Sequence, residues 1–438
     1  MSTSNFPVKN WFLVIAMKRV MAIHTRILIT CILMMIGLVV VPKVQNLFTS
    51  EETDVMDFGA KGDGITDDSL AVNKAWSRAC GSTAGRLKFG PGNFVVGPIT
   101  FSGPCKAKTV VVNVIGDVTA FAKKNWHNNT DTWMKFQNID NLVITGSGHF
   151  KGQGATGWWD SCKQALGFHA CNGLQLLGVT SIDSPRNHIS VNACDGTVIS
   201  NINIIAPKDS PNTDGIDISA TNGLQLNGGN IGTGDDCVAI NGESFNINIT
   251  NLNCGPGHGI SVGSLGRNGA RDVVGYITVD GCTFTDTQNG VRIKTVPGGS
   301  GSASNITFSN ITMRNVENPI ILTQFYCPHQ NPKKCKDILP VVKINGVWFN
   351  DIHGTSSKQN AINIACSANS GSCKGITLQN INIQASNSSV SVGSTCQNAN
   401  PLVIPPVSPS VVCTPPSLIE MALDYNYDEK SQDGIAIA

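Results

Sequence analysis

Residues 210–240 read SPNTDGIDISATNGLQLNGGNIGTGDDCVAI. Two polar clusters stand out in this stretch, the first ending at Asp214 and the second formed by Asp235 and Asp236. Each cluster precedes a short alternation of apolar residues, which begins at Ile216 in one case and at Val238 in the other. Because side chains alternate between the two faces of a strand, this spacing predicts two similar strands that each carry acidic groups at one end.

The same pattern continues beyond residue 240. His258 lies between two glycines ahead of Ile260, and Arg292 and Lys294 alternate with apolar residues. The inward positions 216, 238 and 260 are separated by steps of 22 and 22 residues. We therefore expect the acidic clusters and the histidine to lie one structural repeat apart on the same face, with both cations pointing outward from the next repeat.

The repeat extends over much of the chain. Segments of the form apolar-x-apolar recur every 23 to 36 residues. They begin at Leu142, Leu174, Val198, Leu224, Ile247, Ile277, Ile306, Val342 and Ile376. A second set of short strands lies between them and continues through residues 319–322 and 361–364. Two or three short strands per repeat without intervening helices favour an all-β, single-stranded right-handed parallel β-helix over a propeller or a leucine-rich repeat.

One helix is expected near the beginning of this solenoid. Asp67 or Asp68 is a suitable N-cap, and apolar residues follow at helical spacing. The expected buried positions are Leu70, Val72, Ala75, Trp76 and Ala79. Such a helix would cap the solenoid and prevent edge pairing. We expect one β-helix domain over residues 51–415, with an insertion that breaks the period over residues 104–171, and a disordered tail over residues 416–438.

The N-terminal residues 1–50 are expected to be a targeting segment and a linker. An apolar run covers residues 27–41 and follows basic residues. As a helix it would span only about 22 Å, less than the ~30 Å hydrocarbon core of a membrane. A cleaved secretory signal fits best, although no clear cleavage site follows, so retention as a membrane anchor is the alternative. The expected location is extracellular, in the cell wall.

The cysteines and glycosylation signals agree with secretion. Of 15 cysteines, 14 follow the apolar run, and none shows the CxxC spacing of a zinc site. Short-loop disulfides are expected, with four close pairs: Cys162 with Cys171, Cys327 with Cys335, Cys366 with Cys373 and Cys396 with Cys413. The partner of Cys254 is either Cys237 or Cys282. Glycosylation sequons occur at Asn128, Asn248, Asn305, Asn310 and Asn387.

Charge and chemistry narrow the function. A net charge of +1 gives no reason to expect a nucleic-acid partner. Carboxylates about 5 Å apart raise one another's pKa values, and a raised carboxyl pKa suits a general acid. Glycoside hydrolysis uses two such groups, and neighbouring cations suit an acidic sugar. The expected substrate is an acidic polysaccharide, cleaved without a metal or other cofactor by a monomeric enzyme.

The four motifs also resemble those of the polygalacturonases, glycoside hydrolase family 28, of the plant type. The resemblance rests on the segments 210–216, 232–237, 255–260 and 292–294, with further similarity at Gln324-Phe325-Tyr326-Cys327. It implies a parallel β-helix that hydrolyses α-1,4-linked galacturonan in pectin with inversion. It implies these roles: Asp235 as general acid, Asp214 and Asp236 holding the attacking water, His258 supporting the acid, and Asn212, Arg292, Lys294 and Tyr326 binding substrate.

Two other functions remain open from the sequence. A calcium-dependent pectate lyase on the same fold would use the carboxylates as metal ligands. A non-catalytic β-helix would bind pectin without cleaving it. Within the hydrolase interpretation, the segment after Cys327 gives a slight preference for cleavage from chain ends over cleavage within chains.

Overall fold

The computed structural model describes residues 52–414, except 123–129, 158, 160–162, 328–336, 370 and 390. The targeting segment expected over residues 1–50, including the apolar run 27–41, lies outside the described residues, as does the tail 416–438. Within the described part, no helix has the length and apolar character needed to span a membrane.

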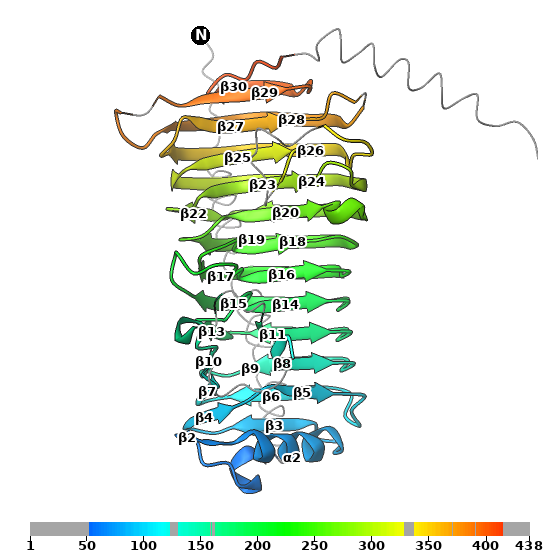
Figure 1. Ribbon diagram of the computed structural model, residues 1–438, viewed down its shortest axis with the longest axis vertical. Coiled ribbons are helices and arrows are strands. Elements are labelled where there is room, and N and C mark those ends of the chain that lie inside the picture. Colours follow the sequence, from blue (N-terminus) through cyan, green and yellow to red (C-terminus); the bar gives the residue numbers. More distant parts are fainter. Residues whose placement is uncertain are drawn as a thin grey trace, which may run out of the picture. The chain divides into compact units, whose positions relative to one another are not determined.

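The described residues form a parallel β-helix, as predicted (Figure 1). One sheet, called sheet 1 here, contains eleven strands that pair in parallel and in chain order. Its strands are β5 (Ile99–Ser102), β8 (Thr132–Gln137), β11 (Gln164–His169), β14 (Ile189–Asn192), β16 (Ile216–Ser219), β18 (Val238–Ile240), β20 (Ile260–Leu265), β23 (Asn289–Thr295), β25 (Asn318–Thr323), β27 (Asn360–Ala365) and β29 (Gly393–Gln397). Each strand of sheet 1 marks one coil of the helix.

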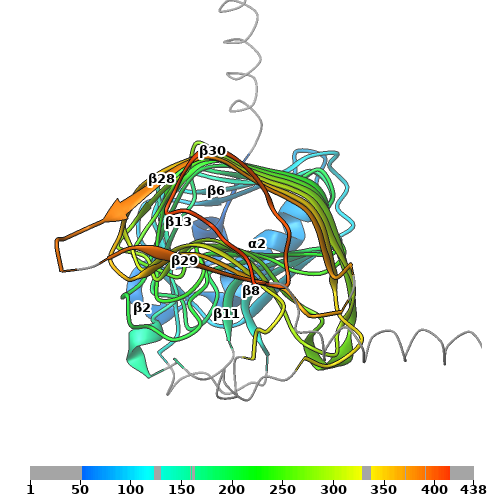
Figure 2. The ribbon, with the colours of Figure 1, turned by 90° about the horizontal axis from the view of Figure 1, so that it is seen from above.

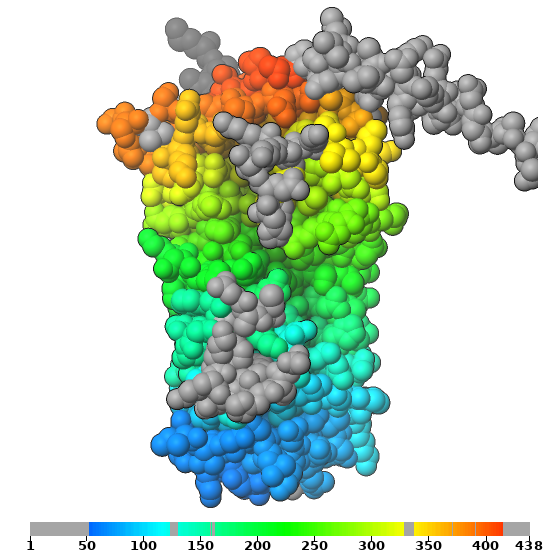
Figure 3. All heavy atoms as spheres, in the orientation of Figure 1, coloured from blue at the N-terminus to red at the C-terminus, as the bar shows by residue number. Residues whose placement is uncertain are grey.

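The other walls of each coil form sheet 2, with nineteen described strands. They are β1 (Thr53–Asp54), β2 (Asp63–Asp67), β3 (Arg86–Phe89), β4 (Asn93–Val96), β6 (Val110–Val114), β7 (Asp117–Ala120), β9 (Leu142–Thr145), β10 (His149–Lys151), β12 (Gln175–Leu177), β13 (Thr180–Ile182), β15 (Val198–Ile205), β17 (Asn222–Gly232), β19 (Ser244–Cys254), β21 (Arg271–Asp280), β22 (Thr283–Thr285), β24 (Ser300–Val316), β26 (Lys343–Ser356), β28 (Cys373–Ala385) and β30 (Leu402–Ser408). Viewed along the axis, successive coils superimpose into one closed outline (Figure 2). Residues of one coil therefore occupy one level of the surface (Figure 3).

The core is a column of side chains stacked from coil to coil. Phe101, Phe136 and Phe168 stack on successive coils, with ring centroids 4.5 and 5.2 Å apart and nearly parallel planes. All three rings are fully buried. Parallel pairing at about 4.8 Å places equivalent side chains directly above one another, so an aromatic residue on one coil is packed by an aromatic residue on the next.

The Asn-rich composition has a backbone cause. One column of corner residues adopts positive φ on successive coils, with values from 48° to 68°. Its members are Gly178, Asn201, Gly228, Asn251, Gly281, Asn310, Asp351 and Asn380. Glycine, asparagine and aspartate tolerate this left-handed conformation best, so the corner between strands selects these residue types.

The expected capping helix is α2 (Ser69–Cys80), which lies within the outline of the coils when viewed along the axis (Figure 2). Trp76 packs edge-on against Phe101 at 5.1 Å and so covers the N-terminal end of the core. Asp68 is the N-cap. The prediction that Leu70 is buried was wrong, because Leu70 is 67% exposed and Ala71 occupies the inward position. The described short 3-10 segments are η1 (Val55–Phe58), η3 (Gly154–Thr156) and η4 (Arg267–Gly269).

Two predictions about the repeat need correction. Residues 104–171 are no insertion, because they contribute strands to both sheets, and pairing starts already where Thr53 meets Leu87. The segment beginning at Val342 is not the counterpart of Ile306 either. Ile306 pairs with Val347, which pairs with Ile376. Irregular loop lengths between strands therefore hid both the start and the register of the repeat.

The described disulfides confirm part of the cysteine prediction. The pairs are Cys80–Cys105, Cys237–Cys254, Cys366–Cys373 and Cys396–Cys413. Cys254 thus pairs with Cys237, and Cys282 is a free, buried thiol. A disulfide at Cys171 is contradicted, since Cys171 is also free and buried, and its amide donates to the Cys194 sulfur at 3.2 Å. Cys162 and Cys335 lie outside the described residues.

The sequons within the described residues are accessible. Asn248, Asn305, Asn310 and Asn387 are exposed, whereas Asn128 lies outside the described residues.

Candidate active site

The four sequence motifs lie on four successive coils, as the 22-residue steps predicted. Ile216 pairs with Val238, Val238 with Ile260, and Ile260 with Val291. All four residues are fully buried in the core. The polar groups next to them are therefore held at successive levels of sheet 1, about 4.8 Å apart.

Two hydroxyl groups fix the turn that carries Asp214. The Ser210 and Thr213 hydroxyls lie 2.6 Å apart, and both residues are fully buried. The Gly234 amide donates to Thr213 Oγ1 at 2.9 Å, which ties this turn to the turn that carries Asp235 on the next coil. A Cβ at position 234 would lie 1.9 Å from the Ser210 carbonyl oxygen, so only glycine permits this approach.

The His258 ring contacts Asp235 across one coil step. His258 Nδ1 lies 2.9 Å from Asp235 Oδ1, and the His258 amide donates to the Asp235 carbonyl at 2.7 Å. Gly259 has φ of +85°, and a Cβ there would lie 2.2 Å from the Gly290 carbonyl oxygen. The flanking glycine therefore lets the chain place His258 directly above Asp235. Although burial alone would raise the Asp235 pKa, the hydrogen bond and charge of His258 lower it below its ordinary value.

Asp236 is the centre of a buried charge cluster. Its Oδ1 accepts from Arg292 at 2.7 Å and from the Ser261 hydroxyl at 3.0 Å, and its Oδ2 accepts from Lys294 Nζ at 2.7 Å. Asp236 is 1% exposed, Arg292 8% and Lys294 5%. The prediction that both cations alternate with core residues is confirmed, but they are not open to solvent, because they are buried against this carboxylate.

Tyr326 covers this cluster. Its ring centroid lies 5.1 Å from Lys294 Nζ and 5.9 Å from the Arg292 guanidinium carbon, which is within cation–π distance. The Tyr326 amide donates to the Thr295 carbonyl at 3.0 Å, so the segment follows β23 on the adjacent coil. Tyr326 thus lies next to the predicted cations, as the resemblance implied.

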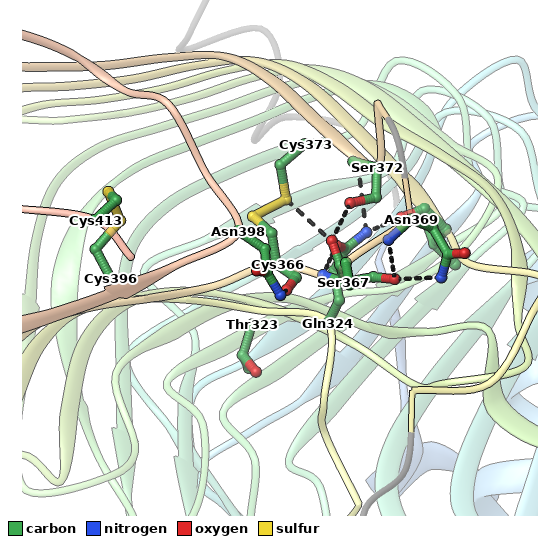
Figure 4. The surroundings of a disulfide bond; sticks show 12 residues. Thr323, Gln324, Cys366, Ser367, Asn369, Ser372, Cys373, Cys396, Asn398 and Cys413 are labelled. Atoms are coloured by element: carbon green, nitrogen blue, oxygen red, sulfur yellow. Dashed lines mark hydrogen bonds between the residues drawn. A yellow bond between two sulfur atoms is a disulfide. The ribbon is translucent and has the colours of Figure 1, made fainter. Parts of the chain in front are cut away.

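Gln324 anchors the segment that carries Tyr326 (Figure 4). It is 1% exposed, and its amide nitrogen donates to the Val342 carbonyl at 2.8 Å. Its amide oxygen accepts from the Ser367 amide at 2.7 Å and lies 3.3 Å from the Cys373 sulfur of the Cys366–Cys373 disulfide. These contacts satisfy the buried amide and fix the chain two residues before the tyrosine.

Several of these groups line one cavity of about 500 Å³. Its lining includes Asp214, Asp235, Asp236, Asn212, Lys294 and Tyr326. Burial, together with the neighbouring carboxylates, raises the pKa of Asp214 well above its ordinary value. The cavity therefore contains two carboxyl groups whose pKa values are shifted in opposite directions, that of Asp214 upward and that of Asp235 downward.

Three cavity residues were missed from the sequence. Asp217 lines the cavity, and so do Arg186 and Arg267. Burial raises the pKa of Asp217 to about 7, with Arg186 opposing the shift and Asp236 and Asp235 adding to it. A signal for Asp217 was present, because it pairs with Ala239 and so belongs to the outward row of sheet 1 that continues to Arg292. Arg186 lies in the loop before β14 and Arg267 begins the short segment η4, so neither belongs to a strand row and neither gave such a signal.

The donor set fits calcium poorly. One ligand atom each of Asp235, Asp236 and His258 lies within 4.8 Å of the others. Both oxygens of Asp236 already accept from cations, and His258 Nδ1 faces Asp235. Calcium takes six to eight oxygen ligands, and a carboxylate saturated by arginine and lysine is a poor one.

A parallel β-helix with several carboxyl groups and a lysine gathered in one cavity of its surface has the acidic groups that carbohydrate cleavage uses. Residues 80–410 match the model of the glycosyl hydrolases family 28, and the chain belongs to this family.

Relatives agree with this membership. A probable polygalacturonase of Arabidopsis thaliana is 43% identical over 349 residues, which cover 78% of this chain and 76% of the relative. A polygalacturonase of Persea americana is 42% identical over 351 residues, or 76% and 75% of the two chains. Among solved structures, an endo-xylogalacturonan hydrolase of Aspergillus tubingensis has the same fold, with a TM-score of 0.67, 24% identity, and coverage of 81% of this chain and 97% of that one.

Proposed function

We propose that this protein is a polygalacturonase that hydrolyses α-1,4-galacturonosyl linkages of pectin. The observation that carries the proposal is the convergence of Asp214, Asp235 and Asp236 with Lys294 in one cavity. The carboxyl groups supply acid and base, and the cations supply the positive potential that an acidic polysaccharide needs. The polygalacturonases among the relatives support the same substrate class.

In the proposed reaction, Asp235 protonates the glycosidic oxygen as the bond from that oxygen to C1 breaks. His258, 2.9 Å from Asp235, holds the proton within the pair until it is delivered. Water attacks C1 from the opposite face and gives its proton to Asp214, while Asp236 helps to orient the water. The products are the two fragments of the cleaved chain, and the new anomeric centre is inverted.

The state of Asp214 sets the acidic limit of this reaction. Asp214 must be ionised to accept a proton, and its raised pKa delays ionisation to higher pH. The rate should therefore rise as Asp214 ionises and fall as the Asp235–His258 pair loses its proton. A bell-shaped pH profile of kcat/KM is expected, and Asp214→Asn should remove its acidic limb together with most of the activity.

Substrate binding is assigned to Asn212, Arg292, Lys294 and Tyr326. Asn212 is exposed at the cavity, and Lys294 and Tyr326 line it. Because Arg292 and Lys294 both bind Asp236, the three groups together carry one net positive charge, and of the two cations only Lys294 is in the cavity lining. A sugar carboxylate would bind to this charge beneath the tyrosine ring.

The assay is release of reducing ends from polygalacturonate. Wild type should release them and Asp235→Asn should be slower by at least about a thousandfold, whereas Asp209→Asn, at an exposed position outside the cavity, should match wild type. Equal activity of Asp235→Asn, or no release by wild type, would show that the protein is not this hydrolase and would favour a pectin-binding role. An ultraviolet-absorbing product that disappears with a chelator would instead identify a calcium-dependent lyase.

Cleavage from chain ends is proposed over cleavage within chains. Chromatography of early products decides, because only monogalacturonate is expected for the end-acting mode and mixed oligomers contradict it.

We also propose that the enzyme acts in the cell wall after secretion as a monomer. N-terminal sequencing of protein recovered from the wall tests this, with a start beyond residue 41 expected and a start within residues 1–26 supporting a retained anchor.

A further inference from the structure

Two cationic side chains of the cavity lining, Arg186 and Arg267, have no role in the proposed reaction. Arg186 lines the cavity and is partly exposed. Lys294 donates to Asp236, and Arg267 Nε donates to the Ser264 hydroxyl at 2.6 Å. The Arg186 guanidinium, by contrast, makes no hydrogen bond or ion pair with any residue that the structure describes, and interacts only at longer range with Asp217. An uncommitted guanidinium that faces a polar cavity is available for a ligand.

Arg186 lies on the opposite side of the acids from the other cations. The amide of His188, two residues further on, donates to the Asp214 carbonyl at 2.8 Å, so Arg186 belongs to the coil directly before Asp214. Lys294 belongs to β23, three coils after the coil of Asp214. At about 4.8 Å per coil, the backbones of Arg186 and Lys294 are four levels apart, but Lys294 Nζ reaches back to Asp236, so its charge lies only about two levels, roughly 10 Å, from the level of Arg186, with the level of Asp214 between them.

We propose that Arg186 binds the carboxylate of a second galacturonate unit, on the N-terminal side of the reacting carboxyl groups, and thereby makes the enzyme select unesterified pectin. The inference rests on the proposed hydrolase function and extends it to substrate selection. A guanidinium grips a carboxylate through two parallel hydrogen bonds, whereas a methyl ester has no charge and offers a weaker acceptor. Together with Lys294, Arg186 makes the cavity require free carboxylates on both sides of the cleaved bond.

Asp217 does not cancel this role at mildly acidic pH. It is the acidic group that interacts with Arg186, and its pKa is raised to about 7 by burial. Below that pH its carboxyl group is largely neutral, so the positive charge of Arg186 remains available to the substrate.

The test compares kcat/KM at pH 5 on polygalacturonate and on the same polymer after extensive methyl esterification. Arg186→Gln should lower kcat/KM on polygalacturonate by about tenfold or more and on the esterified polymer by less than about threefold, so that the preference for the unesterified polymer shrinks. Arg186→Lys keeps the charge without the paired donors and should fall between wild type and Arg186→Gln. The matched control is Arg314→Gln, because Arg314 is exposed and lies outside the cavity lining.

An unchanged kcat/KM of Arg186→Gln on polygalacturonate, or an equal loss on both polymers, would overturn the inference. Circular dichroism melting establishes that the variants fold. If Arg186→Gln does not fold, the result for Arg186→Lys decides. A loss of about threefold in kcat/KM on polygalacturonate alone would support the inference. No loss, or an equal loss on both polymers, would overturn it. If wild type releases no reducing ends from either polymer, the proposed function fails, and the inference fails with it.

Discussion

Replacing Asp217 by asparagine should stabilise the protein, and by more at higher pH. Burial raises the Asp217 pKa from its ordinary 3.8 to about 7. In the unfolded chain the carboxyl group ionises near its ordinary value, so between these pH values the folded protein holds a proton that the unfolded chain has lost. The full stability contribution is therefore present below pH 3.8 and is lost as pH rises towards 7. Asparagine has no proton to lose and avoids this penalty.

The expected magnitude follows from the shift. At 1.36 kcal/mol per unit, a rise from 3.8 to about 7 corresponds to about 4 kcal/mol. Asp217 is partly exposed, and solvent screening reduces such contributions, so about 2 kcal/mol is a realistic gain in the free energy of unfolding at pH 8. At pH 3.5 the gain should fall to a few tenths of a kcal/mol or less, because the carboxyl group is protonated in the folded protein and mostly protonated in the unfolded chain, whose pKa is near the ordinary 3.8.

Urea unfolding at pH 3.5, 6 and 8 measures this gain. Asp209→Asn is the matched control, because Asp209 is exposed outside the cavity, and it should stay within about 0.5 kcal/mol of wild type at each pH. The reasoning would be refuted if Asp217→Asn were no more stable than wild type at pH 8, or if its gain did not increase with pH. Either result would mean that Asp217 is ionised at little cost in the folded protein.

Three further predictions concern the same site. Asp236→Asn should lower the free energy of unfolding by about 3–5 kcal/mol in urea melts, because it leaves two buried cations side by side. Lys294→Met leaves the pair of Asp236 and Arg292 intact and should cost less. If Asp236→Asn cost the same as Lys294→Met or less, Asp236 would not be the group that stabilises the two cations. Gln324→Leu should cost about 2 kcal/mol and, by releasing Tyr326, raise KM more than it lowers kcat, and a change in stability alone would limit Gln324 to a structural role. Proton NMR of the first products should show the β-anomer, because inversion converts an α-linked substrate into a β-anomeric product. The α-anomer would indicate retention. The measurement discriminates, because the coil step of about 4.8 Å is closer to the carboxyl separation of retaining enzymes than to the roughly 6.5–9.5 Å of typical inverting enzymes.

The parts of the fold that could be predicted from the sequence are those where the repeat length is constant. The 22-residue steps fixed the register of Ile216, Val238 and Ile260, and the structure confirms it. Around Val342 the same counting failed, since the loop before it changes the length of the coil and moves the true partner of Ile306 to Val347. Period alone cannot reveal how much of a coil is loop.

The sequence predicts which residues form the site better than it predicts their burial and their charge interactions. The alternation of residues along the strand predicts that the Lys294 side chain points outward and is exposed, yet Lys294 is only 5% exposed. Its burial depends on Asp236, 58 residues earlier, and on the ring of Tyr326, which reaches it from a later loop. The position of Arg186 in the cavity likewise depends on the conformation of the loop that carries it. Contacts of this kind arise from loop conformation, and strand alternation carries no information about it.

The coil step explains why the acids differ in protonation. Parallel pairing places Asp214 and Asp236 on adjacent levels about 4.8 Å apart, a separation at which two partly buried carboxylates repel. The chain resolves this repulsion by giving Asp236 both buried cations and leaving Asp214 none in direct contact. The pKa of Asp214 is therefore raised, whereas His258 on the other side lowers the pKa of Asp235. The placement of Arg292, Lys294 and His258 around equally spaced carboxyl groups thus gives Asp214 and Asp235 different pKa values. The proposed reaction runs against this resting preference: Asp214 must lose its proton before it can act as the base, and the Asp235–His258 pair must carry the proton that Asp235 delivers.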